Sequence, residues 1–279
     1  MISVIVATYN SAATLARTLE SLAAQRDADF EVLVADGGSQ DGTLSIVDRF
    51  TGLVTHRISG PDRGVYDAWN KVVPAARGEW VMFLGSDDWL HAPDTLAQLE
   101  AAASALPPAR RELAYVFGQT LFREGDALLE TFGAMPIASA RLGSEDYIPF
   151  SHTGLLHHRS LFATFGLFDA GFRSAGDYEF LLRTMKDGRT RFHHAPLIVA
   201  EMAIGGMSTG AASRVHHYRE MLVARRKLGF ASNPGWLLAN YRRARISAAL
   251  IGLTGERITL LITNLYRRMA GKELRERRS

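Results

Sequence analysis

The stretch Trp80-Val81-Met82-Phe83-Leu84-Gly85-Ser86-Asp87-Asp88 decides the fold class of this 279-residue chain. Five apolar residues in succession are typical of a strand that is buried on both faces of a sheet. Two acidic residues directly after such a strand are costly unless water or a cation surrounds them. The stretch therefore predicts a buried strand that ends at a metal site, with helix capping or a solvated loop as the alternative.

Similar apolar runs occur upstream, at residues 2–7, 30–35 and 54–58, and helical patterns alternate with them at 15–22, 41–50 and 65–76. This alternation predicts an α/β fold with a doubly wound, mostly parallel, Rossmann-like sheet. Ligands in such sheets bind at the carboxyl ends of the strands. The polar clusters of the chain follow those ends.

The pattern changes downstream of residue 114. Runs at 114–122 and 128–132 predict a β-hairpin, 178–186 a helix and 190–199 a last strand. After Gly205-Gly206 the chain is expected to be helical and basic to its end. We predict a domain over 1–210 and a basic helical extension over 211–279.

Composition excludes several kinds of site. The chain has no cysteine, which rules out disulfides, thiolate zinc sites and cysteine nucleophiles. The start Met1-Ile2-Ser3-Val4 lacks the basic region of a signal peptide, so a cytoplasmic location is expected. Residues 214–279 hold 15 of the 32 Lys and Arg but 4 of the 29 Asp and Glu, a local net charge of +11 that leaves −8 for the remainder.

Two polar clusters follow the second and third strands. The first is Asp36-Gly37-Gly38-Ser39-Gln40-Asp41-Gly42. Its carboxylate and backbone amides are expected to face a ligand. The alternative is an ordinary turn in which Asp41 caps a helix. The first strand is not followed by G-x-G-x-x-G, so a dinucleotide fingerprint is absent. Asp67, Asn70 and Lys71 share one helical face, and a solvated ion pair explains their spacing equally well.

A third cluster, Gly176-Asp177-Tyr178-Glu179, opens the predicted helix at 178–186. Asp177 is either the N-cap of that helix or a general base, and spacing does not decide between these roles. None of the histidines has the spacing of a zinc site, so each is expected to be a packing or surface residue.

Taken in order, these segments resemble the family 2 glycosyltransferases of the GT-A fold over residues 1–210. The resemblance rests on residues 4–10, 34–43, 62–71, 78–88, 166–169 and 175–183. The segment 62–71 is similar to that of a bacterial surface-polysaccharide subgroup that includes colanic-acid-type enzymes. The sequence departs from the pattern in two ways: Ser86 replaces the first acid of the D-x-D motif, and Val72-Val73 stand where relatives often have glycine.

The resemblance implies roles for ten residues. Asp177 is the expected catalytic base and Asp88 the expected ligand of a divalent metal, Mn²⁺ or Mg²⁺. The expected donor-binding residues are Thr8, Tyr9, Asp36, Asp62, Arg63, Asp67, Lys71 and Asp87.

The implied reaction inverts the configuration of a sugar moved from a nucleotide-sugar donor to a hydroxyl of a glycan or lipid-linked acceptor. A UDP-sugar is the first expectation for the donor, with GDP- and dTDP-sugars as alternatives, in exopolysaccharide, capsule or lipopolysaccharide assembly. A sugar-phosphate nucleotidyltransferase is a rival, although Asn10-Ser11-Ala12-Ala13 lacks its glycine-rich basic loop. The second rival interpretation is a non-catalytic, lectin-like relative.

The basic tail carries Arg242, Arg243, Arg245, Arg257, Arg267 and Arg268 among apolar residues. Its longest weakly polar run, 246–254, is far short of the ~20 residues of a membrane span. The tail is expected either to lie on an anionic membrane surface, at the inner face of the cell membrane, or to cap the core. It shows no nucleic-acid-binding motif, and no nucleic-acid partner is expected.

Overall fold

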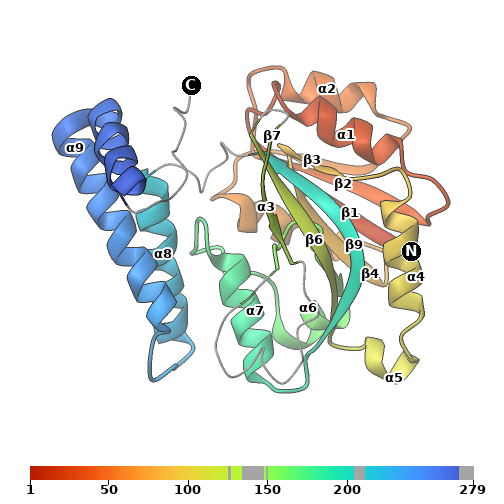
Figure 1. The fold of residues 1–279 in the computed structure, drawn as a ribbon. Helices are drawn as coiled ribbons and strands as arrows, with labels where there is room; N and C mark the ends of the chain where they lie inside the picture. Colours follow the sequence, from red (N-terminus) through yellow and green to blue (C-terminus); the bar gives the residue numbers. More distant parts are fainter. Residues whose placement is uncertain (125–126, 134–147, 149, 204–210, 270–279) are drawn as a thin grey trace. The chain divides into compact units, whose positions relative to one another are not determined.

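The computed structural model describes residues 1–124, 127–133, 148, 150–203 and 211–269 (Figure 1). Strands and helices alternate in the first part of the chain, as the sequence predicts. They are β1 (Ile2–Thr8), α1 (Leu15–Ala23), β2 (Phe30–Asp36), α2 (Thr43–Arg49), β3 (Val54–Ser59), α3 (Val65–Val72) and β4 (Trp80–Gly85). These four strands are parallel, in the order β3-β2-β1-β4.

The second part of the fold adds antiparallel strands to this sheet. Its elements are β5 (Asp88–Leu90), α4 (Thr95–Ser104), α5 (Pro108–Arg111), β6 (Ala114–Glu124), β7 (Ala127–Phe132), β8 (Leu156–His158), α6 (Ser160–Phe165), α7 (Gly176–Lys186) and β9 (Arg191–Ala203). The described strands form one sheet, in the order β3-β2-β1-β4-β8-β6-β9-β5, with β7 paired to β6. Short β8 runs antiparallel to both β4 and β6, while β6 and β9 are parallel.

Helices cover both faces of the sheet. Alternate residues of β1, β2 and β4 pack with apolar side chains of α1, α2 and α4, including Leu19, Val47 and Leu99, in one buried core cluster. The opposite face carries Phe83 of β4, whose ring lies 4.5 Å from that of Trp69 in α3. Phe168, which precedes α7, lies 5.1 Å from Phe83 and 4.8 Å from Phe180 of α7. The predicted doubly wound arrangement is confirmed.

The helix expected over 65–76 is shorter than predicted. It ends at Val72 and continues as one 3-10 turn, η1 (Val73–Ala75). Pro74 explains the ending because its ring excludes the main-chain hydrogen bond that would extend an α-helix. Val72 and Val73, which stand where relatives often have glycine, are both buried.

The chain divides into two compact units, Met1–Gly206 and Met207–Ser279. The second unit contains α8 (Ala211–Lys227) and α9 (Gly235–Met269), which pack against each other. Gly255, with φ of 77°, breaks the regular helical geometry within α9. Gly205-Gly206 and the predicted boundary at residue 210 lie outside the described residues. None of the helices in the described part of the chain has the length and apolar character that a bilayer span requires.

Candidate functional site

The carboxyl ends of β1, β2 and β4 meet at one edge of the sheet. Thr8 lies opposite Asp36 in the β1–β2 ladder, and Ala7 lies opposite Gly85 in the β1–β4 ladder. The parallel register therefore brings Thr8 and Asp36 beside the turn that carries Asp87 and Asp88. Thr8 is buried, and its hydroxyl has no hydrogen-bond partner among the described residues.

Hydrogen bonds connect the loops that follow these three strands. The Asn10 amide donates to Oγ of Ser39 at 2.8 Å, and the Ala12 amide donates to Oδ2 of Asp41 at 3.0 Å. The hydroxyls of Ser11 and Ser86 lie 2.8 Å apart, so the loop after β1 also contacts the turn after β4. Asp41 is not the N-cap of α2, because Gly42 occupies that position with φ of 96°.

A pocket of about 210 Å³ opens at this edge. It is lined by Ala35, Asp36, Ile58, Ser59, Gly60, Pro61, Asp62, Ala68 and Lys71. Oδ2 of Asp36 accepts hydrogen bonds from Oγ of Ser59 at 2.6 Å and from the amides of Gly38 and Ser39, each at 3.1 Å. Burial disfavours the carboxylate, but the hydrogen bonds from Ser39 and Ser59 outweigh it and hold the pKa of Asp36 below its usual value. The carboxylate is therefore ionised at neutral pH.

Tyr9 and Asp62 approach each other across Gly37. A Cβ atom at Gly37 would lie 2.7 Å from Oδ2 of Asp62 and 3.2 Å from the Tyr9 ring, so a side chain there would force both away. Tyr9 is 64% exposed, and Oδ1 of Asp62 accepts a hydrogen bond of 2.8 Å from the Gly64 amide.

Asp67 of α3 pairs with two cations of its own neighbourhood. Its Oδ1 lies 2.8 Å from Arg63 and its Oδ2 3.3 Å from Nζ of Lys71. The hydrogen bond from Arg63 is the main cause of a lowered pKa of Asp67. Lys71 also donates to the Pro61 carbonyl at 2.8 Å, which holds its ammonium group at the pocket wall. Of the predicted face of Asp67, Asn70 and Lys71, Lys71 lines the pocket. The side chain of Arg63 is 76% exposed.

Asp87 and Asp88 turn toward each other over Gly85. A Cβ atom at Gly85 would lie 2.7 Å from Oδ2 of Asp88 and 2.9 Å from Oδ1 of Asp87. Burial, reinforced by the charge of Asp87, raises the pKa of Asp88 to about 7, and burial also raises the pKa of Asp87. Oγ1 of Thr153 donates to Asp88 at 3.1 Å.

The carboxylate pair suits a hard divalent cation. Oxygen ligands are what Mg²⁺ and Mn²⁺ prefer, often with one or two carboxylates and the remaining positions held by water or phosphate. Within the described residues, neither Asp87 nor Asp88 forms an ion pair, and three or more His, Asp or Glu side chains do not gather into a metal cluster. The protein's own share of the ligands would be these two carboxylates.

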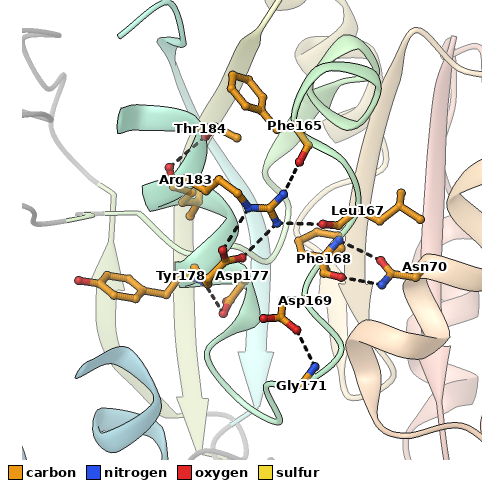
Figure 2. A network of polar contacts seen from close by, with 12 residues as sticks. Asn70, Phe165, Leu167, Phe168, Asp169, Gly171, Asp177, Tyr178, Arg183 and Thr184 are labelled. Atoms are coloured by element: carbon orange, nitrogen blue, oxygen red, sulfur yellow. Dashed lines mark hydrogen bonds and ion pairs between the residues drawn. The ribbon is translucent and has the colours of Figure 1, made fainter. Parts of the chain in front are cut away.

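Asp177 is the second residue of α7, because the helix begins at Gly176 and Ala175 occupies the N-cap. The N-cap alternative for Asp177 is therefore wrong. Its Oδ1 accepts hydrogen bonds from the Tyr66 hydroxyl at 3.0 Å and from the Tyr178 amide at 2.8 Å, the latter drawn in Figure 2. Spacing in the sequence did not single out Tyr66 or Thr153 as partners of the two acidic residues.

The segment that leads into α7 is held by side chains of two helices (Figure 2). Arg183 donates to the Leu167 carbonyl at 2.8 Å, to the Phe165 carbonyl and to the buried carboxylate of Glu179. Asn70 of α3 bonds the main chain of Phe168. These contacts fix α7, and Asp177 with it, against α3.

His152 and His157 lie behind the site in an aromatic layer that also contains the rings of Trp69, Phe83 and Phe168. His157 is fully buried and His152 is partly buried; desolvation lowers the pKa of His152 to about 3 and holds that of His157 well below its usual value. His152 stacks on Trp69 with ring centroids 5.2 Å apart. These two histidines are neutral packing residues, as predicted.

Comparison with known proteins identifies the family. The model of "Glycosyl transferase family 2" matches residues 3–110. The PGL/p-HBAD biosynthesis glycosyltransferase of Mycobacterium bovis is 34% identical over 218 residues, which cover 75% of this chain and 79% of the relative. The chain belongs to glycosyl transferase family 2. Another relative, an uncharacterized glycosyltransferase of Mycobacterium tuberculosis, is 31% identical over 184 residues, covering 65% of this chain and 68% of that protein.

Solved structures confirm the GT-A fold for this family 2 member. Staphylococcus aureus TarS 1–349 in complex with UDP-GlcNAc has a TM-score of 0.62 at 21% identity, over 91% of this chain and 75% of that chain. The mannosyltransferase PcManGT of Pyrobaculum calidifontis, in complex with GDP-Man and Mn²⁺, has a TM-score of 0.58 at 21% identity, over 98% of this chain and 81% of that chain. At these identities the likeness extends to the fold alone.

Proposed function

We propose that this family 2 member transfers a sugar from a nucleotide-sugar donor to an acceptor hydroxyl with inversion of configuration. The observation that carries the proposal is that α3 contacts both the pocket and Asp177. One side of this short helix places Lys71 at the pocket that Asp36 also lines, and the other side bonds Asp177 through Tyr66. A pocket that carries the Asp36 carboxylate and the Lys71 ammonium group is thus joined by two turns of helix to a carboxylate able to act as a base.

The pocket takes the nucleotide part of the donor. Asp36 is ionised and accepts hydrogen bonds from the base, with Thr8 and Tyr9 beside it at the end of β1. Asp62, Arg63, Asp67 and Lys71 face the ribose, the phosphates or the sugar, and the two cations offset the negative charge of the diphosphate. A UDP-sugar is the first choice, because a structural neighbour is bound to UDP-GlcNAc, and the neighbour bound to GDP-Man keeps GDP-sugars as the alternative. A dTDP-sugar is the third.

Asp88, assisted by Asp87, would hold Mn²⁺ or Mg²⁺. When bound, such an ion neutralises the charge that develops on the departing nucleoside diphosphate. The presence of Mn²⁺ in the PcManGT complex supports this choice of cofactor. Ser86 stands where a D-x-D motif has its first acid, and its hydroxyl lies against that of Ser11, so Asp87 and Asp88 are the acids left for the metal.

Asp177 acts as the general base. Its carboxylate removes the proton of the acceptor hydroxyl while that oxygen attacks the anomeric carbon from the face opposite the diphosphate. The new carbon–oxygen bond forms as the bond to the nucleoside diphosphate breaks, which inverts the anomeric centre in one displacement. An α-linked donor then gives a β-linked product, without a covalent enzyme intermediate.

The acceptor is a glycan or lipid-linked sugar in surface-polysaccharide assembly, as in the colanic-acid-type subgroup, and the tail brings the enzyme to it. Leu238, Ile246 and Leu253 of α9 are 37%, 61% and 83% exposed, and the exposed Arg242 and Arg245 fall on the same helical stripe. Apolar side chains flanked by arginines suit the surface of an anionic membrane. We place the enzyme in the cytoplasm, at the inner face of the cell membrane.

The decisive experiment is a panel of nucleotide sugars with Mn²⁺ or Mg²⁺, scored for nucleoside diphosphate release in the parent and in Asp177→Asn. The variant should lower turnover by about 10²–10⁴-fold and keep donor affinity and melting temperature near the parent. Near-parental transfer by the variant would contradict the base assignment. Pyrophosphate in place of nucleoside diphosphate would identify a nucleotidyltransferase, and donor binding without turnover would identify a non-catalytic relative.

A further inference from the structure

The side chain of Tyr66 connects α3 to Asp177 across 111 positions of sequence. Its hydroxyl donates to Oδ1 of Asp177 at 3.0 Å, and the Tyr178 amide donates to the same oxygen at 2.8 Å. Two donors that converge on one carboxylate oxygen, one from each helix, restrict rotation of the carboxylate. The direction in which Asp177 presents its carboxylate therefore depends on Tyr66.

The Tyr66 ring is itself held firmly. It is 3% exposed, and its centroid lies 5.4 Å from that of Trp69 and 5.8 Å from that of Phe168. A Cβ atom at Gly176 would lie 2.8 Å from two carbons of the ring, so a glycine is needed at the start of α7 to admit it. Burial, followed by the charge of Asp177, raises the pKa of Tyr66 well above its usual value, so the hydroxyl keeps its proton.

Two neighbouring rows of side chains on α3 carry different contacts, so the predicted face of Asp67, Asn70 and Lys71 divides between them. Tyr66 and Asn70, four residues apart, bond Asp177 and the main chain of Phe168. Asp67 and Lys71, again four residues apart, form the ion pair at the pocket wall. One rigid helix thus fixes the position of the base relative to the pocket.

We propose that Tyr66 is a positioning residue, which orients the carboxylate of Asp177 for proton removal from the acceptor hydroxyl. The inference rests on the proposed function, because Tyr66 acts on the reaction through the general base. It assigns no donor contact to the Tyr66 hydroxyl.

The test is a double-mutant cycle of Tyr66→Phe and Asp177→Asn. Tyr66→Phe should lower kcat by roughly ten- to a hundredfold, because a misoriented base loses part of its advantage, while KM for the donor stays within about twofold. In the Asp177→Asn background, Tyr66→Phe should cause no further loss, since the group that it orients is already absent. A merely structural role would instead lower both backgrounds alike.

Tyr115→Phe is the matched control. Tyr115 is fully buried, and its hydroxyl lies 3.0 Å from Oγ1 of Thr184, on the same helix as Asp177. This variant removes a comparable hydroxyl contact from α7 without touching Asp177, so melting temperature should fall as in Tyr66→Phe while turnover stays parental. Gly176→Ala provides a second perturbation, because the added methyl group displaces the Tyr66 ring, and it should reproduce the kcat loss with Tyr66 intact.

The outcomes separate the two proposals. If Asp177→Asn keeps near-parental turnover, the base assignment and the role of Tyr66 are both wrong. If Asp177→Asn is impaired but Tyr66→Phe is not, or if the two losses multiply in the double variant, the role of Tyr66 is wrong and the proposed function stands.

Discussion

The side-chain amide of Asn70 pairs with the main chain of Phe168 on both of its edges. Nδ2 donates to the Phe168 carbonyl at 2.7 Å, and Oδ1 accepts from the Phe168 amide at 3.0 Å (Figure 2). Phe168 thereby gains the two hydrogen bonds that a neighbouring strand would supply, although it lies in an irregular segment. Its ring at the same time fills the aromatic layer against Phe83 and Phe180.

Asn70→Ala should therefore lower the free energy of unfolding by about 2–4 kcal/mol, because two main-chain groups lose their partners. Asn70→Asp should cost a similar amount, since a carboxylate in place of Nδ2 faces the Phe168 carbonyl. Denaturant unfolding provides the measurement. Gln98→Ala is the control. It removes from α4 an exposed amide that donates to Asp94, and it should change the unfolding free energy little.

Asp88→Asn should separate metal binding from stability. Above pH 7 the buried carboxylate of metal-free protein is ionised at a cost, because its pKa is about 7 in the folded state against an ordinary value of 3.8. At about 1.4 kcal/mol per pKa unit, the variant should be more stable than metal-free parent by up to roughly 4 kcal/mol at pH 8. The difference should shrink as the pH falls from 7 toward 4.

The same Asp88→Asn variant should lose the effect of Mn²⁺ on donor affinity, which titration calorimetry with and without the ion measures. Ser86→Ala is the control, because it removes a neighbouring hydroxyl and leaves both carboxylates in place. An unchanged metal response in Asp88→Asn would show that the ion, if it is used, binds elsewhere.

Asp36→Asn should weaken binding of the nucleotide by about ten- to a hundredfold, the usual range for a hydrogen bond to a charged group. The loss should be equal for the nucleotide sugar and for the free nucleoside diphosphate, and absent for a sugar 1-phosphate. Ser59→Ala, which removes one donor to the same carboxylate, should have the smaller effect. Equal weakening of the sugar 1-phosphate would place Asp36 away from the base.

The histidines packed among the aromatic rings should make the protein acid-sensitive. His152 is neutral in the folded state down to about pH 3, whereas the unfolded chain binds its proton near pH 6.5. Stability is therefore lost as the pH falls from 6.5 toward 3, by about 1.4 kcal/mol per pH unit for each such histidine. His152→Phe should reduce the pH slope of the unfolding free energy by that amount, and an unchanged slope would show that His152 is protonated in the folded protein.

Arg242→Gln combined with Arg245→Gln should lower partitioning onto vesicles that contain phosphatidylserine by roughly thirtyfold, at about 1 kcal/mol for each arginine. Cosedimentation at low and high salt measures the effect, which salt should abolish. A control with Arg26→Gln and Arg49→Gln removes the same charge from exposed positions of the first unit. Equal losses in the two double variants would mean that net charge, rather than α9, drives binding.

The sequence predicts most of the first half of the fold, because long apolar runs such as that of β4 end at clear turn residues. It does not predict β8, whose three residues include His157 and His158. So short a strand has no periodicity of its own, and its place between β4 and β6 depends on pairing with partners distant along the chain. The same holds for β5, which begins at Asp88 itself.

The site follows a similar rule. Residues next to strand ends, such as Asp36 and Asp88, can be found from the strands that precede them. Their partners come from elsewhere: Thr153 lies 65 positions after Asp88, and Tyr66 lies 111 positions before Asp177. One local signal does exist, since glycine in the first turn of α7 disfavours a helix and indicates a close neighbour.

The hydrogen bonds among the loops after β1, β2 and β4 affect how strongly the site binds any nucleotide, whereas the pocket walls affect which nucleotide it prefers. The backbone entropy of these loops is lost when the chain folds, so little is left to lose when a ligand arrives. Substitutions at Ser39 or Asp41 would loosen the loops and weaken every nucleotide by a similar factor. Changes in the pocket walls would instead alter which nucleotide is preferred, so the strength and the choice of binding can evolve at separate positions.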